Sequence, residues 1–211
     1  MKFIGFYNYT VILTYISLIS GVLGIKFAHE GRVGLAVCCL IFSGICDMFD
    51  GAVARTKKDR TEDQKNFGIQ LDSLCDVICF GVLPAIILYF LGVDDGIGIA
   101  MLIFYVLCAV IRLAFFNVLE TKRQKTEGGC AKAYRGLPVT SASIILPFFY
   151  LLGLVLPDKA MIVICYILPV LTGLAFITDF RFPKLDISKL LHRRREESDQ
   201  EEEKKEETPV A

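Results

Sequence analysis

The chain has 211 residues, of which 54% are hydrophobic, and its 23 basic residues equal its 23 acidic ones. Its mean hydropathy is +0.54. A water-soluble domain of this size could not bury so much apolar surface, so the composition excludes an ordinary soluble protein and predicts a membrane protein. Neither sign of charge is in excess, and no nucleic-acid partner is expected.

The cysteines do not form an obvious disulfide or zinc-binding pattern. Cys130 alone lies in a polar stretch, and no pair has the spacing of a metal-binding loop. The other seven lie in apolar runs and are interpreted as small buried apolar residues. They are Cys38, Cys39, Cys46, Cys75, Cys79, Cys108 and Cys165.

Six apolar stretches are long enough to cross a bilayer, which takes about 20 residues. In chain order they are Tyr9–Phe27, Val33–Phe49, Gly68–Gly92, Ile97–Val118, Leu137–Leu156 and Ala160–Ile177. The expected fold is therefore an all-α polytopic membrane protein whose six-helix domain covers residues 9–185. Residues 1–8 form either a short interfacial helix or a disordered start, and residues 186–211 form a charged, disordered cytoplasmic tail.

The basic residues are divided unequally between the two sides of this arrangement. Nineteen lie at the N-terminus, in the tail and in two long connections, Gly51–Phe67 and Leu119–Gly136. Three lie in the short connections on the other side, and Arg112 lies within a span. The positive-inside rule places both termini and both long connections in the cytoplasm.

Four aspartates stand where a membrane helix should be apolar. Asp47 and Asp50 are three residues apart, and Asp72 and Asp76 are four apart, so each pair projects from one face of its helix. The two helices are consecutive and antiparallel, which brings the four carboxylates together near the cytoplasmic boundary. Like charges this close need a cation between them.

Carboxylate oxygens select hard cations, so we expect two Mg²⁺ or Mn²⁺ ions in this cluster. Such a two-metal site suits displacement at phosphorus. Two other readings remain: the acids pair with Arg55 and Lys57 at helix ends, or they carry a cation through a small transporter. Gly51, Ala54 and Gly68 leave room for either close helix packing or a ligand, and the guanidinium of Arg55 suits a phosphate.

The runs DMFDGAVAR from Asp47 and GIQLDSLCD from Gly68 resemble the signature of the CDP-alcohol phosphatidyltransferases. The later runs DSLCDVICFGVLPA, RLAFFN and YRGLP resemble its phosphatidylserine synthase branch. The resemblance implies an integral membrane enzyme that transfers the phosphatidyl group from CDP-diacylglycerol to the hydroxyl of L-serine and releases CMP. It also implies a homodimer in the cell membrane, with the active site facing the cytoplasm.

The resemblance assigns roles residue by residue. Asp47, Asp50 and Asp72 match the ligands of one metal, Asp47, Asp72 and Asp76 those of the second, and Asp76 the general base. The positions that match contacts to CDP are Gly51, Ala54, Arg55 and Gly68, with Thr61 as the nearest candidate for a hydroxyl contact. Candidates for the acceptor site are Arg112, Asn117 and Arg135.

The sequence departs from the family pattern in three places. Twelve residues separate Arg55 from Gly68 where about eight are usual, Cys79 stands in place of Ser, and Phe116 in place of a basic residue. These departures concern the acceptor rather than the metals. Transfer to another alcohol, such as glycerol 3-phosphate or an inositol phosphate, is therefore the alternative.

Overall fold

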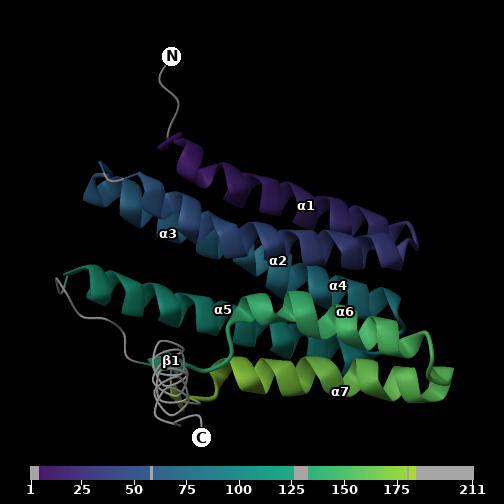
Figure 1. Ribbon diagram of the computed structural model, residues 1–211. Helices are drawn as coiled ribbons and strands as arrows, with labels where there is room; N and C mark the ends of the chain where they lie inside the picture. Colours follow the sequence, from purple (N-terminus) through teal and green to yellow (C-terminus); the bar gives the residue numbers. More distant parts are fainter. Residues whose placement is uncertain (1–4, 58, 126–132, 180, 184–211) are drawn as a thin grey trace, which may run out of the picture.

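The computed structural model describes residues 5–57, 59–125, 133–179 and 181–183. These residues form a bundle of helices that run roughly along one axis (Figure 1). In chain order the elements are η1 (Tyr9–Val11), α1 (Ile12–His29), α2 (Val33–Thr56), α3 (Glu62–Asp76), η2 (Val77–Val82), α4 (Leu83–Phe90), α5 (Gly96–Lys125), β1 (Ala133–Arg135), η3 (Val139–Ser141), α6 (Ala142–Gly153), α7 (Asp158–Ile177) and β2 (Arg181–Pro183). The short strands β1 and β2 pair antiparallel, with Tyr134 opposite Phe182.

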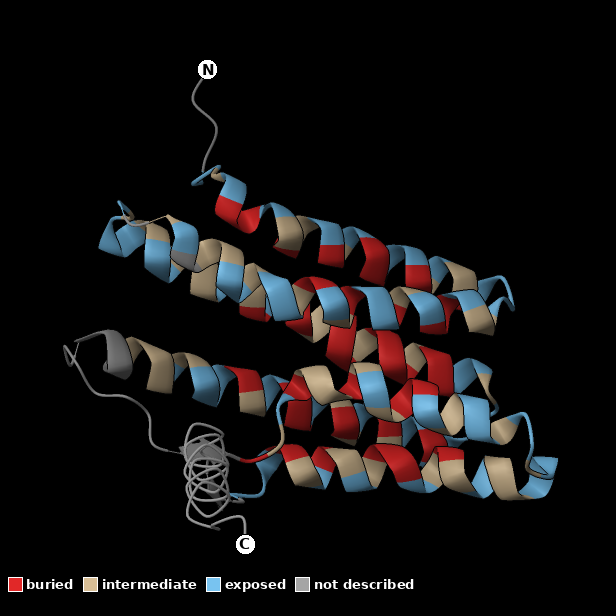
Figure 2. Ribbon diagram, viewed as in Figure 1, coloured by how far each residue is buried: buried red, intermediate tan, exposed pale blue. Residues whose placement is uncertain are grey.

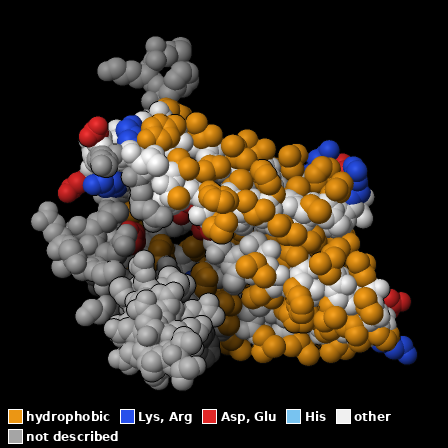
Figure 3. Space-filling view, viewed as in Figure 1, with side chains coloured by type: hydrophobic (Ala, Val, Ile, Leu, Met, Phe, Trp, Pro, Cys, Tyr) orange, Lys and Arg blue, Asp and Glu red, His pale blue; other side chains and the backbone are white. Residues whose placement is uncertain are grey.

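Five helical runs in the described residues are long and apolar enough to cross a membrane. The predicted span Leu137–Leu156 instead forms η3 and α6, an apolar helical segment of only 15 residues, Val139–Gly153. Hydrophobic side chains cover the middle of the face in Figure 3, and charged side chains gather at its two ends. This distribution is that of a protein surrounded by lipid.

The helices extend beyond the apolar stretches that predicted them. α2 continues to Thr56 and α3 begins at Glu62, which reduces the expected connection Gly51–Phe67 to five residues. Thr61 caps α3, because its side-chain oxygen accepts a hydrogen bond from the N–H of Gln64 at 3.3 Å. Hydropathy marks where lipid contact ends, whereas the cap marks where the helix begins, so the predicted boundaries were wrong here.

The run α3–η2–α4 is the most buried of the five, and Figure 2 shows buried residues gathered around it. Its centre, η2, is π-helical, with the N–H of Leu83 bonded to the carbonyl of Ile78. Pro84 has no N–H to offer the Phe80 carbonyl four residues earlier. The hydroxyl of Tyr105 on α5 donates to that carbonyl at 2.6 Å. The π-helical segment therefore begins directly after Asp76 and is held by a side chain from another helix.

Three side chains join α1, α2 and η2, and we call them the serine–cysteine cluster: Ser17, Ser43 and Cys79. Ser43 Oγ donates to the carbonyl of Ser17 at 3.1 Å, and Ser17 Oγ donates to the carbonyl of Ser43 at 3.4 Å. Cys79 Sγ donates to the Ser17 carbonyl at 3.3 Å. A Cβ on Gly21 would lie 2.8 Å from Cys79 Sγ, so only glycine lets the helices approach this closely.

The interpretation of the cysteines holds for five of them. Cys46, Cys75, Cys79, Cys108 and Cys165 are buried, and the seven described cysteines are free thiols. Cys38 is exposed and Cys39 is half-buried. The prediction was wrong for these two because an apolar stretch that spans a membrane has an outer face as well as a buried one. Cys130 lies outside the described residues.

Candidate functional site

Three of the four aspartates meet where α2 and α3 face one another. Oxygens of Asp47, Asp50 and Asp72 lie within 4.8 Å of one another, and all three residues are half-buried. We call these residues the acid triad. Asp76 lies one turn beyond Asp72 on α3, is 7% exposed, and is not a member of the triad. Its carboxyl group lies within hydrogen-bonding reach of Asp47.

The donor set of the acid triad fits a hard divalent cation. The Oδ1 atom of Asp72 is buried and has no hydrogen-bond partner among the described residues. Asp50 Oδ2 accepts a hydrogen bond from Thr14 Oγ1 at 3.5 Å, which orients that carboxylate from α1. Among the residues that the structure describes, the ligand atoms of this group are all carboxylate oxygens, which favour Mg²⁺ or Mn²⁺ over softer metals.

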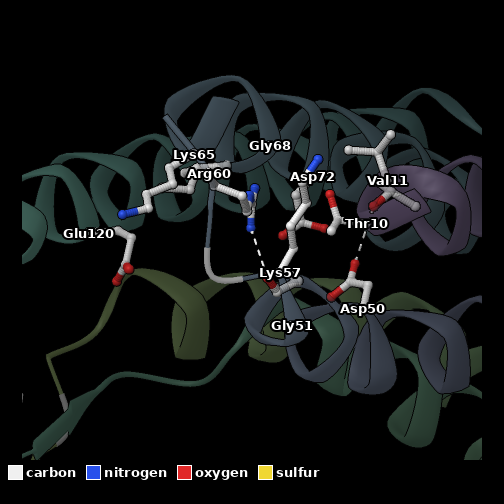
Figure 4. Close-up of a pocket in the computed structure, with 13 residues that line it drawn as sticks. Thr10, Val11, Asp50, Gly51, Lys57, Arg60, Lys65, Gly68, Asp72 and Glu120 are labelled. Atoms are coloured by element: carbon white, nitrogen blue, oxygen red, sulfur yellow. Dashed lines mark hydrogen bonds between the residues drawn. The ribbon is translucent and has the colours of Figure 1, made fainter. Parts of the chain in front are cut away.

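A cavity of about 460 Å³ opens beside the acid triad (Figure 4). Its size lies within the range of small-molecule sites. Asp50, Gly51, Ala54, Gly68 and Asp72 line it, so the structure brings together residues that the sequence pattern had singled out. The other lining residues are Thr10, Val11, Thr14, Lys57, Arg60, Lys65, Ile69 and Glu120.

The two glycines of the cavity differ in what lies beside them. A Cβ built on Gly51 would meet nothing within 4 Å, so that side of α2 faces open space. A Cβ on Gly68 would lie 2.7 Å from Arg60 Nη2. Gly51 thus leaves space for a ligand, whereas Gly68 leaves space for a guanidinium group of the protein itself.

Two predicted nucleotide contacts are not placed in the cavity by the structure. Thr61 caps α3 and is not among the residues that line the cavity. The backbone of Arg55 belongs to the last turn of α2, and its side chain lies outside what the structure describes.

The predicted acceptor residues lie elsewhere. Arg112 Nε donates to the carbonyl of Leu137 at 3.2 Å, and Arg112 lines a separate cavity of about 230 Å³ between α5 and α7. Asn117 Oδ1 accepts a hydrogen bond from Ser73 Oγ at 2.7 Å, which ties α5 to α3 beside Asp72. The backbone of Arg135 forms part of β1, but its side chain is not described.

Sequence reasoning missed several residues of the cavity. Thr14 is a hydroxyl residue in an otherwise apolar stretch, and that signal could have identified it. Lys57, Arg60 and Lys65 belong to a predicted connection whose length differs from the family pattern, so nothing in the sequence placed them at the cavity. They form a basic group at the cavity that hydropathy and motif spacing did not predict.

The chain matches the family model for CDP-alcohol phosphatidyltransferase over residues 7–179. It is 34% identical over 176 residues to the archaetidylserine synthase of Methanothermobacter thermautotrophicus, which covers 83% of this chain and 69% of that protein. It is 31% identical over 183 residues to the CDP-diacylglycerol–serine O-phosphatidyltransferase of Helicobacter pylori, covering 84% of this chain and 72% of the relative.

A protein of the same name from Methanocaldococcus jannaschii is 31% identical over 173 residues, which cover 82% of this chain and 72% of that protein. No solved structure gives a significant match. The family match covers the acid triad, the cavity and all five long helical runs. On these grounds the chain belongs to the CDP-alcohol phosphatidyltransferases, a family of membrane enzymes.

Proposed function

We propose that this enzyme transfers the phosphatidyl group from CDP-diacylglycerol to the hydroxyl of L-serine, giving phosphatidylserine and CMP. The acid triad at the edge of a cavity lined by Gly51, Ala54 and Gly68 carries this proposal, because it combines a metal-binding carboxylate set with room for a nucleotide. The names of the relatives, which are serine phosphatidyltransferases and an archaetidylserine synthase, support serine as the acceptor.

The residues divide the chemistry between them. Asp47, Asp50 and Asp72, whose oxygens converge, would hold one divalent cation, and Asp47, Asp72 and Asp76 would hold a second. When bound, the two cations supply positive charge that offsets the negative charge of the diphosphate. Thr14 orients Asp50 through its hydrogen bond.

Asp76 is the general base of the proposed reaction. Its carboxylate accepts the proton of the serine hydroxyl, whose oxygen forms a bond to the phosphorus that carries diacylglycerol. The bond from that phosphorus to the bridging oxygen of CMP breaks, and CMP leaves with the electron pair. Asp76 is suited to this role because it lies one turn from Asp72 and is not one of the three residues of the acid triad.

The nucleotide half of the substrate occupies the cavity along α2 and α3 in this proposal. Gly51 and Ala54 allow the ligand to approach the helix backbone closely, and Arg55 binds a phosphate. Lys57 and Lys65 add positive charge to the lining of the cavity. Arg112, Asn117 and Arg135 remain candidates for the acceptor side, with Asn117 acting through Ser73 on α3.

We further propose six membrane spans, with α6 as the short fifth one, in a catalytic domain of residues 9–185. Figure 1 supports this arrangement, because the ends of α2 and α5 and the starts of α1 and α3 lie at one end of the bundle. Both termini and the active site then face the cytoplasm at the cell membrane, and residues 186–211 form the cytoplasmic tail. The enzyme works as a homodimer, by analogy with its family.

An acceptor panel tests the function. Purified protein is given CDP-diacylglycerol, Mn²⁺ or Mg²⁺, and in turn L-serine, glycerol 3-phosphate or an inositol phosphate, and both CMP and the lipid product are measured. Release of CMP with L-serine, in a one-to-one ratio with phosphatidylserine, is expected. Release with a different acceptor alone would replace serine by that alcohol, and absence of CMP together with cation flux in liposomes would make the protein a transporter.

A further inference from the structure

Arg60 joins the end of α2 to the start of α3 across the cavity. Its Nη1 atom donates to the carbonyl of Ala54 at 3.2 Å, and its Nη2 atom donates to the carbonyl of Gln64 at 3.3 Å. Ala54 belongs to the last turn of α2, where carbonyls lack partners within the helix and a cation is favourable. The guanidinium is therefore held in a fixed place rather than extended into solvent.

The two carbonyls do not use all the donors of this side chain. A guanidinium has five N–H groups, and Nε of Arg60 has no hydrogen-bond partner among the described residues although it is buried. Arg60 also lines the cavity, and in Figure 4 it lies between Lys65 and the labelled aspartates. Arg60 therefore has N–H groups without a described partner at a cavity that has room for a ligand.

The charges around the cavity indicate what that ligand is. Lys57, Arg60 and Lys65 line it together with the acids Asp50, Asp72 and Glu120. The amine of Lys57 donates a hydrogen bond to Asn8 Oδ1 at 2.9 Å, whereas the guanidinium of Arg60 keeps donors that no described residue accepts. A ligand that contacts both Arg60 and the aspartates needs anionic oxygens for the guanidinium and a divalent cation for the carboxylates, which is the chemistry of a nucleotide phosphate.

We propose that Arg60 is a substrate-binding residue that donates hydrogen bonds to a phosphate oxygen of the nucleotide half of CDP-diacylglycerol. Gly68 then serves binding indirectly, because a Cβ at this position would displace Nη2 of Arg60. Arg60 lies in the connection between α2 and α3, so the length of this connection places the phosphate contact. The inference rests on the proposed function for the identity of the nucleotide.

Binding measured without any acceptor tests the inference. The dissociation constants of CMP, cytidine and CDP-diacylglycerol are measured in the presence of Mn²⁺ for the wild type, Arg60→Gln and Arg32→Gln. Arg32 carries the same charge at the opposite end of α2, away from the cavity, and serves as the matched control. Loss of a charge-assisted hydrogen bond should weaken CMP and CDP-diacylglycerol roughly tenfold or more in Arg60→Gln only.

Cytidine, which has no phosphate, should bind Arg60→Gln and the wild type within about twofold of each other. Equal CMP affinity in the wild type and Arg60→Gln would overturn the proposal. If the melting temperature of Arg60→Gln were nevertheless lower, Arg60 would serve only to link the two helices. Tighter CMP binding in Arg60→Gln would also overturn it, because the guanidinium would then compete with the nucleotide. Arg60→Lys, which keeps the charge, should recover part of the lost CMP affinity.

The proposed function can fail separately. If the wild type binds CMP but forms no phosphatidylserine with any L-serine concentration, the acceptor assignment is wrong, while the comparison between Arg60→Gln and Arg32→Gln still decides the role of Arg60. If Arg60→Gln changes neither CMP binding nor the KM for CDP-diacylglycerol while the wild type makes phosphatidylserine, only the inference about Arg60 is wrong.

Discussion

The cavity beside the acid triad and the serine–cysteine cluster are built from the same kinds of residue, and they use them in opposite ways. In the cluster, Gly21 faces the thiol of Cys79, and Ser17 and Ser43 satisfy one another across α1 and α2. In the cavity, Gly51 faces open space and Asp72 Oδ1 has no partner among the described residues. Small and polar residues therefore stabilise the bundle where neighbouring groups contact them, and leave open space and unpaired polar atoms where no neighbour does.

The sharpest contrast is expected between two aspartates. Asp76→Asn should lower kcat at least a hundredfold, because an amide cannot accept the serine proton, and it should largely spare CDP-diacylglycerol binding. Asp95→Asn makes the same change in the loop before α5, at the far end of the bundle, and should leave kcat within about threefold. CMP release and lipid binding check both. Turnover near the wild-type rate in Asp76→Asn would show that another group is the base.

A pair of glycine variants separates packing from binding. Gly21→Ala should lower the free energy of unfolding by about 2 kcal/mol, because its Cβ meets Cys79 Sγ at 2.8 Å in a filled interior. Gly51→Ala should leave stability unchanged and raise the KM for CDP-diacylglycerol, since its Cβ points into open space. Melting temperatures and KM values measure the two effects. If both variants lost stability equally, the cavity would be no more open than the interior.

The bond between Tyr105 and the Phe80 carbonyl allows a matched pair of phenol deletions. Tyr105→Phe removes the hydroxyl that donates to the buried Phe80 carbonyl and should cost about 1–3 kcal/mol of stability. It should also lower kcat, because the π-helical segment it holds begins directly after Asp76. Tyr166→Phe removes a hydroxyl that bonds to Asp95 at an exposed position and should have a smaller effect on both. If Tyr105→Phe and Tyr166→Phe lost equal stability and equal kcat, the π-helical segment would not contribute specifically to the activity.

The smallest effect is a dependence of stability on pH in the loop before α5. The hydroxyl of Tyr166 and the N–H of Gly98 lower the pKa of Asp95 below its ordinary value of 3.8. Because the folded pKa is the lower one, this stabilisation is present above the unfolded pKa and is lost as the pH falls through the folded value. Melting curves of the wild type and Asp95→Ala should therefore differ slightly at neutral pH and converge in acid. A difference that grew in acid would contradict this assignment.

The sequence predicted the long helices and the acid triad because both depend on local patterns. Twenty apolar residues in a row specify a span, and aspartates three or four residues apart specify one face of a helix. The convergence of Asp47 and Asp50 with Asp72 followed from two antiparallel neighbours, and the structure places these three within 4.8 Å. Asp76 lies one turn further along α3, within reach of Asp47 but outside the set whose oxygens all lie within 4.8 Å of one another, and spacing alone does not resolve this difference.

The remaining parts of the site depend on contacts between distant segments. Arg60 reaches Ala54 and Gln64 because the connection folds back over the cavity, and no periodicity predicts that path. Arg112 was predicted as an acceptor residue because it is a cation within a span, and that prediction stays untested. Its hydrogen bond from Nε to the carbonyl of Leu137, 25 residues along the chain, could not be predicted from local spacing. The hydrogen bond from Tyr105 to the Phe80 carbonyl also joins segments 25 residues apart, so local spacing did not predict it.

Binding of Mn²⁺ measured together with product formation tests the central claim most directly. For the wild type with CDP-diacylglycerol and L-serine, CMP and phosphatidylserine should appear in equal amounts, in proportion to the Mn²⁺ bound, and chelation should abolish both. Asp72→Asn should lose the bound Mn²⁺ and both products, whereas Asp95→Asn should keep all three. Equal product formation by Asp72→Asn, or products that persist after chelation, would contradict a metal-dependent phosphatidyl transfer at the acid triad.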